Sequence, residues 1–441
     1  MKTTKIFSFI AALLAMLMVL SACGAASGTP SATQAASQSA DTQPTAATEK
    51  AADPVTLTYC NFNSSGGNEE TLAKMVEAFE ASHPDIKVDV ETIGYDDYFT
   101  QMQTRVAGGT APDCYELNIE NFAAYANKGL LAEISGVDVS GLNDTALNAF
   151  CVNGKQYGLP ESFSNVVLIY NKDLFDAAGV EYPSNDLTME DYDALARKMT
   201  SGSGDTKVYG CHYHTWRSAA SLFSILDGKN TIIDGKYDFM KPTYDMVIAQ
   251  QKDGICMDYG YLKTSSLHYS AAFENQQCAM VNMGSWFIST LEAYMKDAET
   301  KFNWGIVKYP HPAGAEAGST LGTVTSLAIN ADSPKAEAAA DFINWCVSEE
   351  GAQAIAKTGT FPACGSAATA EIIKSTEGFP EDSNSVDALT TSNVYLEMPY
   401  TQYASDIETI LNAEHDAIMT MSETVDEGIQ NMNDQVPAVL G

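Results

Sequence analysis

Positively charged residues are scarce in this sequence of 441 residues. Lysine and arginine together number 24 against 57 aspartate and glutamate residues, which gives a formal net charge of −33. Only Arg105, Arg197 and Arg217 could supply the forked guanidinium that phosphate recognition favours. A chain with this charge repels phosphate backbones and anionic lipid headgroups. We therefore expect no nucleic-acid partner.

Motifs of the common catalytic and cofactor sites are also missing. The sequence has no G-x-S-x-G nucleophile elbow, no H-E-x-x-H zinc motif and no G-x-G-x-x-G that opens a helix after a strand. The Gly-Lys pairs that begin at 154, 228 and 235 lack the following Ser or Thr of a phosphate-binding loop. The six histidines are dispersed apart from His212 and His214. The sequence therefore predicts no metal site, no cofactor and no enzymatic activity.

Closely spaced cysteine pairs are absent as well. Besides Cys23 the chain has eight cysteines, and none of them forms a C-x-x-C or zinc-finger pattern. Several have aromatic or apolar neighbours, as Cys346 does between Trp345 and Val347. An exported chain could form disulfides, but these neighbours favour mostly reduced cysteines that are buried as small hydrophobic residues.

The N-terminal segment predicts export. Lys2 and Lys5 precede a mostly apolar run from Ile6 to Leu20, which matches the apolar region of a signal peptide and is short for a membrane-spanning helix. The four residues Leu20-Ser21-Ala22-Cys23 resemble the lipobox of bacterial lipoproteins. This resemblance implies a signal peptide at 1–22, a lipidated Cys23, and attachment to the outer face of the cell membrane through the lipid anchor only.

Residues 23–54 form a low-complexity segment. After Cys23 it contains small or polar residues, with no aromatic residue and no aliphatic residue larger than alanine. Such a composition cannot bury enough apolar surface to offset the entropy of ordering. We expect a disordered tether between the anchor and a folded body.

From residue 55 the sequence alternates strands with helices. Strands of alternating apolar residues are followed by amphipathic helices, such as the helix predicted at 95–107 before Gly108 and Gly109. The same alternation restarts at 166–170 and predicts a second α/β unit up to about residue 312. Strands separated by helices of this length indicate parallel sheets covered on both faces. A helix is also expected at 335–347, where Trp345 falls on the apolar face.

Five segments of this body resemble a known family. Residues 86–98 (IKVDVETIGYDDY) with 107–113 (AGGTAPD) resemble the first lobe of the family 1 extracellular solute-binding proteins. These are the sugar-binding subunits of ABC importers and include the maltose-binding proteins. The other segments follow in the order of the family: residues 170–175 (YNKDLF), 284–286 (GSW), 318–322 (GSTLG), and 348–351 (SEEG) with 356–359 (AKTG).

The resemblance implies the α/β fold of type II periplasmic binding proteins, with two lobes joined by a hinge and each lobe a sheet covered by helices. Mapped onto this chain, lobe one is expected at 55–160 plus 320–370 and lobe two at 165–312 plus 372–441. The function implied is that of a monomeric receptor that closes its lobes around a carbohydrate, with an oligosaccharide as the expected ligand, and delivers it to ABC permease subunits. The site is expected in the crevice at the carboxyl ends of the strands.

Candidate ligand-binding residues follow from the chemistry of sugars, which present flat CH faces and many hydroxyl groups. Trp286 follows a predicted strand and resembles the stacking tryptophan of the maltose-binding members. Trp216 and His214 lie between a strand and a helix, where the family places ligand-facing aromatic residues. Tyr403 is a candidate stacking residue of the second lobe. For each of these residues a packing role is the alternative.

The polar candidates follow predicted strands or lie at the two lobe crossings. Asn118 and Glu120 resemble positions where maltose-binding members carry an acidic partner for a hydroxyl group, although Asn121 replaces their basic neighbour, which argues against maltose itself. The remaining candidates are Asn61, Asn63 and Ser65 after the first strand, Glu161 and Asn165 at the first crossing, and Gly322 and Thr323 at the second.

Two other functions stay open at this point. A secreted glycoside hydrolase is possible because 57 carboxylates allow a pair at catalytic separation. A binding protein for a non-sugar solute such as a peptide is the other alternative. Ligand recovered intact after incubation with the protein would distinguish a receptor from a hydrolase.

Overall fold

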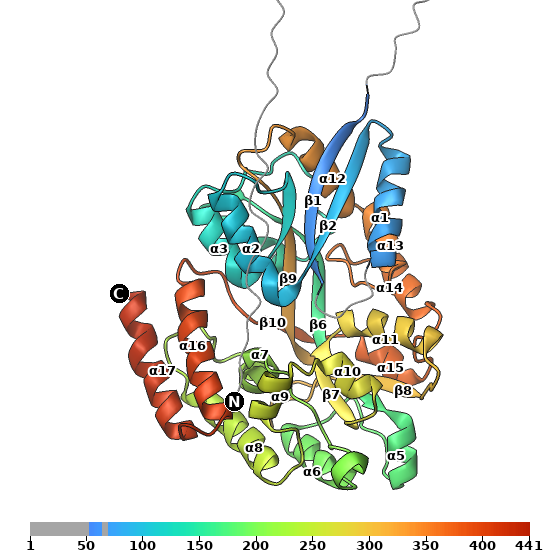
Figure 1. Cartoon of the computed structure of the whole chain (residues 1–441), viewed down its shortest axis with the longest axis vertical. Helices are drawn as coiled ribbons and strands as arrows, with labels where there is room; N and C mark the ends of the chain where they lie inside the picture. The colour runs from blue at the N-terminus through green and yellow to red at the C-terminus, as the bar shows by residue number, and fades with distance from the viewer. Residues whose placement is uncertain (1–52, 64–68) are drawn as a thin grey trace, which may run out of the picture. The chain divides into compact units, whose positions relative to one another are not determined.

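The computed structural model describes residues 53–63 and 69–441. Within them the chain begins with alternating strands and helices, as the sequence predicts: β1 (Val55–Asn63), α1 (Glu69–Ser82), β2 (Ile86–Gly94), α2 (Tyr95–Ala107), β3 (Cys114–Asn118) and α3 (Ile119–Asn127). Strand β1 pairs in parallel with β2 on one side and with β3 on the other. These elements form the blue and cyan part of Figure 1.

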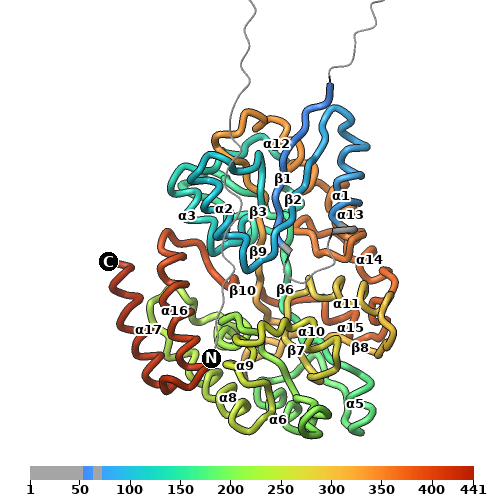
Figure 2. Tube along the Cα trace, in the orientation of Figure 1, coloured from blue at the N-terminus to red at the C-terminus, as the bar shows by residue number. Residues whose placement is uncertain are grey.

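Two long strands connect this part of the sheet with the remaining strands. In β6 (Leu159–Asn171), residues 159–165 pair with β9 (Ser319–Ile329), and residues 166–171 pair with β7 (Met280–Gly284) and β8 (Trp304–Lys308). The end of β9 pairs with β3, and its start pairs with β10 (Asn393–Leu396). The two long strands therefore join a first group of strands, β1 to β3, to a second group, β7, β8 and β10. The course of both strands can be followed in Figure 2. Strand β6 changes partners between Asn165 and Val166.

The expectation of purely parallel sheets is wrong. Strand β9 is antiparallel to β3 and β6, and β7 and β8 are antiparallel to β6. The reason is that β6 and β9 carry the chain between the two groups of strands in opposite directions. Alternating apolar residues indicate a strand but not its direction. The lobe boundaries expected from the family resemblance remain a prediction.

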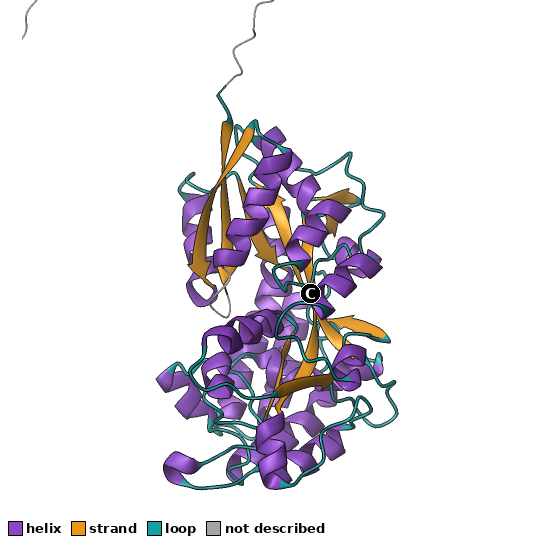
Figure 3. Ribbon diagram, turned by 90° about the vertical axis from the view of Figure 1, so that its right-hand side faces the viewer, coloured by secondary structure: helices purple, strands orange, loops and turns teal. Residues whose placement is uncertain are grey.

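Helices lie on both sides of the strands in Figure 3. After α3 they are α4 (Asp144–Asn148), α5 (Lys172–Ala178), α6 (Met189–Met199), α7 (Arg217–Ser221), α8 (Lys241–Lys252), α9 (Tyr259–Ser265), α10 (Tyr269–Glu274), α11 (Trp286–Asp297), α12 (Ala336–Cys346), α13 (Glu349–Ala356), α14 (Ala367–Lys374), α15 (Ser383–Ala388), α16 (Ala404–Met419) and α17 (Val425–Leu440). Short 3₁₀ turns at 204–206, 222–227 and 238–240 and a small hairpin, β4 (Cys151–Val152) with β5 (Lys155–Gln156), complete the described elements.

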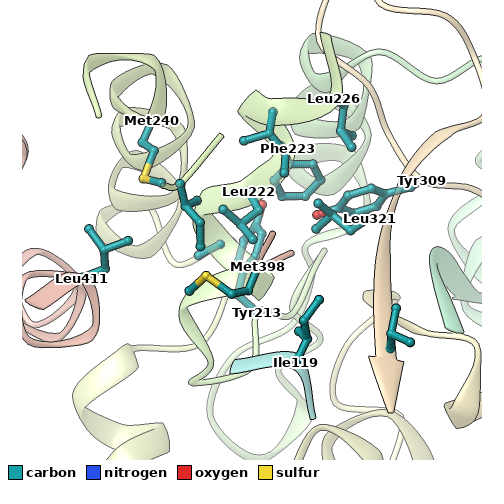
Figure 4. Packing of buried hydrophobic residues seen from close by; sticks show 14 of the residues in the cluster. Ile119, Tyr213, Leu222, Phe223, Leu226, Met240, Tyr309, Leu321, Met398 and Leu411 are labelled. Atoms are coloured by element: carbon teal, nitrogen blue, oxygen red, sulfur yellow. The ribbon is translucent and has the colours of Figure 1, made fainter. Parts of the chain in front are cut away.

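Three buried apolar clusters hold these layers together. The cluster in Figure 4 joins β9, the 222–227 turn and the last helices, and in it Phe223 stacks on Tyr309 with ring centroids 4.5 Å apart. A second cluster contains Trp345, which is 5% exposed and lies 5.6 Å from the ring of Phe79. The core position expected for Trp345 is thus confirmed. The packing of the Figure 4 cluster fixes the backbone beside the cavity described below.

The eight cysteines beyond Cys23 are all free. Seven are buried and Cys151 is half-buried, which agrees with the expected role as small hydrophobic residues. Among the described helices, none combines the length and the apolar composition that crossing a membrane requires. The predicted signal peptide, Cys23 and Ser65 lie outside the described residues, as does the tether up to residue 52.

Candidate functional site

A cavity of about 630 Å³ is lined by residues from both groups of strands. Several of them stand where strands end: Asn118 is the last residue of β3, Gly284 is the last residue of β7, and Glu397 directly follows β10. Carboxyl ends of strands are where α/β folds place ligands. The arrangement therefore offers a site to which both groups of strands contribute.

One side of the cavity is an aromatic wall, formed by Phe62, Tyr95, Phe99, His214, Trp216 and Trp286. Tyr95 begins α2, and its ring lies 5.6 Å from that of Trp216, which precedes α7. The ring of Trp216 in turn lies 6.3 Å from that of Trp286 and 4.6 Å from that of His214. The wall thus joins rings from widely separated segments into one surface that a flat apolar face can contact.

The indole ring of Trp286 is fixed on two sides. Its Nε1 donates a hydrogen bond to the hydroxyl oxygen of Tyr269 over 3.0 Å. The ring also lies against the Cα of Gly284, because a Cβ placed on Gly284 would come within 2.0 Å of it. Glycine at position 284 therefore allows Trp286 to fold back over the end of β7.

The cavity lining also contains a carboxylate cluster, which consists of Glu120, Glu397 and Glu408 and lies around Arg217. Arg217 donates from Nη2 to Oε1 of Glu408 over 2.5 Å, and its side chain is only 3% exposed. Thr323 donates to Oε2 of Glu397 over 2.9 Å. The fold brings these groups together because α16 packs against both α3 and α7. Figure 1 shows α16 beside the C-terminal helix α17 and pointing toward α3.

Burial controls the protonation of the groups around the cavity. It raises the pKa of Glu120, and the neighbouring Glu397 and Glu408 raise it further. It also raises the pKa of Glu397, although hydrogen bonding by Ser218 and the charge of Arg217 oppose this effect. Burial, with some repulsion from His212 and His268, lowers the pKa of His214 to about 2, so this imidazole is neutral at physiological pH.

Within residues 53–63 and 69–441, no three His, Cys, Asp or Glu side chains are arranged to hold a metal ion. His212 is fully buried, and neither of its ring nitrogens has a hydrogen-bond partner in this part of the chain.

The cavity contains part of the residue set expected from the sequence: Trp286, Trp216, His214, Asn118, Glu120 and Thr323. Asn118 also has a structural role. Its Oδ1 caps α3 by accepting a bond from the backbone of Asn121, and its Nδ2 donates to the hydroxyl of Tyr95 over 3.1 Å. Asn118 therefore positions Tyr95 and is already engaged without a ligand.

Among the other expected residues whose side chains the structure describes, Asn61, Glu161, Asn165, Gly322 and Tyr403 do not line this cavity. Asn61 is buried and accepts a hydrogen bond from Thr92, and Glu161 interacts with the buried Glu116. Asn165 and Gly322 face each other across β6 and β9, where a Cβ on Gly322 would lie 2.5 Å from the ring of Phe163. Tyr403 directly precedes α16, and Asn63 is the last residue of β1. Roles for these residues in binding remain predictions.

Several residues that line the cavity are not among the site residues predicted from the sequence, most clearly Tyr95, Arg217, Glu397 and Glu408. Glu397 carried a usable signal, because it follows the short apolar strand Asn393–Leu396. Arg217 directly follows Trp216, which the sequence predicted as a ligand-binding residue. Glu408 lies within a helix and had no local signal, since only the packing of α16 on α3 and α7 brings it to the cavity.

The chain is similar to proteins of known family and structure. Residues 74–381 match the family model of bacterial extracellular solute-binding proteins. A structure of a sugar transporter from Rhizobium etli in an open conformation is 40% identical, with a TM-score of 0.74 over 87% of this chain and 99% of that one. An ABC substrate-binding protein from Listeria monocytogenes in complex with cycloalternan is 30% identical, with a TM-score of 0.76 over 88% of this chain and 100% of that one.

A further relative comes from the curated proteins. The arabinooligosaccharide-binding protein of Bacillus subtilis is 28% identical over 315 residues, which cover 67% of this chain and 70% of the relative. The structural neighbours share the two-lobed fold expected from the sequence. The family match extends over more than half of the chain. This protein belongs to the bacterial extracellular solute-binding proteins.

Proposed function

We propose that this protein captures a carbohydrate in the cavity and delivers it unaltered to the permease subunits of an ABC importer. The observation that carries the proposal is the combination, in one cavity, of the aromatic wall with the carboxylate cluster and Arg217. A sugar ring offers CH faces for the first and hydroxyl groups for the second. Neither a purely apolar solute nor a highly charged anion would use both.

The energetics suit a receptor that must also release its ligand. Hydrogen bonds to charged groups contribute about 1.5–3 kcal/mol each, and an aromatic face contributes about 1 kcal/mol beyond the area it buries. Three or four such bonds and two faces, less the cost of closing the lobes, give roughly 8 kcal/mol, which corresponds to a micromolar dissociation constant.

An oligosaccharide is the ligand that the relatives support. The Listeria protein binds cycloalternan, and the Bacillus protein is named for arabinooligosaccharides. The cavity of about 630 Å³ falls within the range of small-molecule sites. Capture would proceed by closure of the two lobes about β6 and β9, which both strand groups share.

The remaining features of the proposal follow from the sequence. The protein is exported by a signal peptide at 1–22, is lipidated at Cys23, and acts as a monomer attached to the outer face of the cell membrane. Residues 23–54 tether a body whose lobes comprise 55–160 plus 320–370 and 165–312 plus 372–441. Radiolabelled palmitate incorporated into the chain in cells, and lost in a Cys23→Ala variant, would test the anchor.

A thermal-shift screen of the purified chain over mono- and oligosaccharides tests the function. A ligand at a hundredfold excess over its dissociation constant stabilises the folded protein by about 2.7 kcal/mol, which raises the melting temperature measurably. A panel without any shift, together with a shift from peptides, would contradict the proposal. Chromatography of the recovered sugar separates a receptor, which returns it intact, from a glycoside hydrolase, which shortens it.

A further inference from the structure

The charges around the cavity do not balance. Five lining side chains are acidic (Asp96, Glu120, Glu397, Glu408 and Asp416), and two are strongly basic (Arg217 and Lys263). Arg217 pairs with Glu408 at 2.5 Å, and Lys263 pairs with Asp416 at 3.3 Å. In the described part of the chain, no ion pair is formed by Asp96, Glu120 or Glu397. By formal count, acidic groups therefore outnumber basic groups around the cavity, and the raised pKa of Glu120 and of Glu397 shows that their negative charges are not fully compensated by the protein.

Glu120 and Glu397 line the same cavity, and their charges interact. Ile119, which precedes Glu120, is 2% exposed, and Met398, which follows Glu397, is fully buried. Both belong to the apolar cluster in Figure 4. The backbone next to each glutamate is therefore anchored in the buried core. Repulsion from Glu397 is the largest contribution to the raised pKa of Glu120 after burial itself. A positive charge placed between the two carboxylates would relieve this repulsion.

Arg217 provides a second, independent indication of what the ligand carries. Its side chain is 97% buried and lines the cavity, yet Nε and Nη1 have no hydrogen-bond partner among the residues that the structure describes. Buried guanidinium N–H groups without acceptors are costly. The ligand is therefore expected to bring hydrogen-bond acceptors to Arg217 as well as donors to the carboxylates.

We propose that this end of the cavity is a subsite for an amino sugar, whose ammonium group lies between Glu120 and Glu397 while neighbouring hydroxyl oxygens accept from Arg217. This inference rests on the proposed function, because it specifies the kind of sugar. An ammonium supplies three donors and one positive charge. A neutral hydroxyl supplies one donor and leaves the repulsion between the two carboxyl groups, and a uronic acid would add a further negative charge.

The test compares matched sugars on the purified full-length chain by calorimetric titration at pH 6.5. The probes are glucose, galactose and mannose, their disaccharides in α- and β-1,4 linkage, and the 2-amino and 2-acetamido counterpart of each. For the sugar that fits, the amine is expected to bind at least about tenfold more tightly than the neutral parent. The acetamido form, which keeps the nitrogen without the charge, is expected to lose that advantage.

Two variants assign the preference to the carboxylates. In Glu120→Gln and in Glu397→Gln, the tenfold preference for the amine is expected to fall to about twofold or less, with binding of the neutral parent reduced far less. Asp205→Asn is the matched control, because it removes the same charge from an exposed residue that does not line the cavity, and the preference should persist.

The outcomes separate this inference from the function on which it rests. A neutral sugar that binds while its amine binds no more tightly would overturn the amino-sugar subsite and leave the carbohydrate receptor intact. A preference for the amine that survives both Gln variants would also overturn the subsite. A panel in which nothing binds would overturn the proposed function itself.

Discussion

The aromatic wall and the carboxylate cluster face the same cavity but are built in different ways. The wall uses rings close to the ends of strands, and the rings contact one another and the backbone, as Trp286 does over Gly284. The cluster takes one side chain each from α3, α16 and the segment after β10, and the charge of Arg217 on α7 partly offsets the repulsion among them. Under the proposed function, the wall would supply contact area for a sugar face, and the cluster would discriminate between sugars by charge.

Replacing Trp286 tests the wall most strongly. Trp286→Ala is expected to reduce affinity by about 30-fold, or about 2 kcal/mol, because it removes a stacking face and its buried area. The melting temperature without ligand is expected to change little. Trp345→Ala is the matched control, since that 5% exposed ring is in the core, and its loss should cost about 3–5 kcal/mol of unfolding free energy with affinity retained. A large loss of stability in Trp286→Ala would return this residue to a core role.

Gly284→Ala tests whether the position of Trp286, and not only its presence, matters. The added Cβ would lie 2.0–2.3 Å from three ring atoms of Trp286, so the ring must leave its place. We expect an affinity loss of about tenfold by calorimetry. Gly94→Ala is the control, because a Cβ at Gly94 meets no atom within 4 Å. Equal affinities in the two variants would show that the wall tolerates a displaced indole.

Arg217→Lys examines the polar side while keeping its charge. Lysine loses the forked donors, so hydroxyl acceptors lose partners, and a reduction of about fivefold in affinity is expected. Arg197→Lys serves as the control: Arg197 is 37% exposed and pairs with Asp193 and Asp253 away from the cavity. Exposed pairs contribute at most about 1 kcal/mol to stability, and no change in affinity is expected there. Unaltered affinity in Arg217→Lys would argue against a direct role for the guanidinium.

Glu292 on α11 is a buried carboxyl outside the cavity and can be compared with the carboxylate cluster. It is 7% exposed, its Oε1 has no partner in the described residues, and burial raises its pKa to about 8. Because the folded pKa lies above the unfolded one, its contribution to stability is present at low pH and is lost as pH rises toward 8. Relative to Glu292→Gln, the unfolding free energy of the native protein is expected to fall by about 3–4 kcal/mol between pH 5 and 8. Parallel pH profiles in chemical denaturation would contradict this.

Residue patterns in the sequence predicted the bounds of helices well and the direction of strand pairing poorly. The helix at 95–107 has the predicted bounds, and that at 335–347 is one residue shorter at each end, because apolar periodicity and terminating residues are local signals. Strand direction was wrong for β6 to β9, since pairing depends on the whole chain path. Trp286 was found because it follows the strand β7, whereas Trp216 was found because tryptophan is rare, although the described strands include none between β6 and α7. Glu408 was not, because only the packing of α16 makes it part of the site.

The most direct test of the account is calorimetric titration of the purified chain with the sugar that gives the largest thermal shift, followed by mass analysis of the sugar released on denaturation. The account predicts one ligand per chain, a dissociation constant near the micromolar range, and release of the sugar with its mass unchanged. Release of shorter sugars, or undiminished binding of the intact sugar after Trp286 is removed, would contradict it.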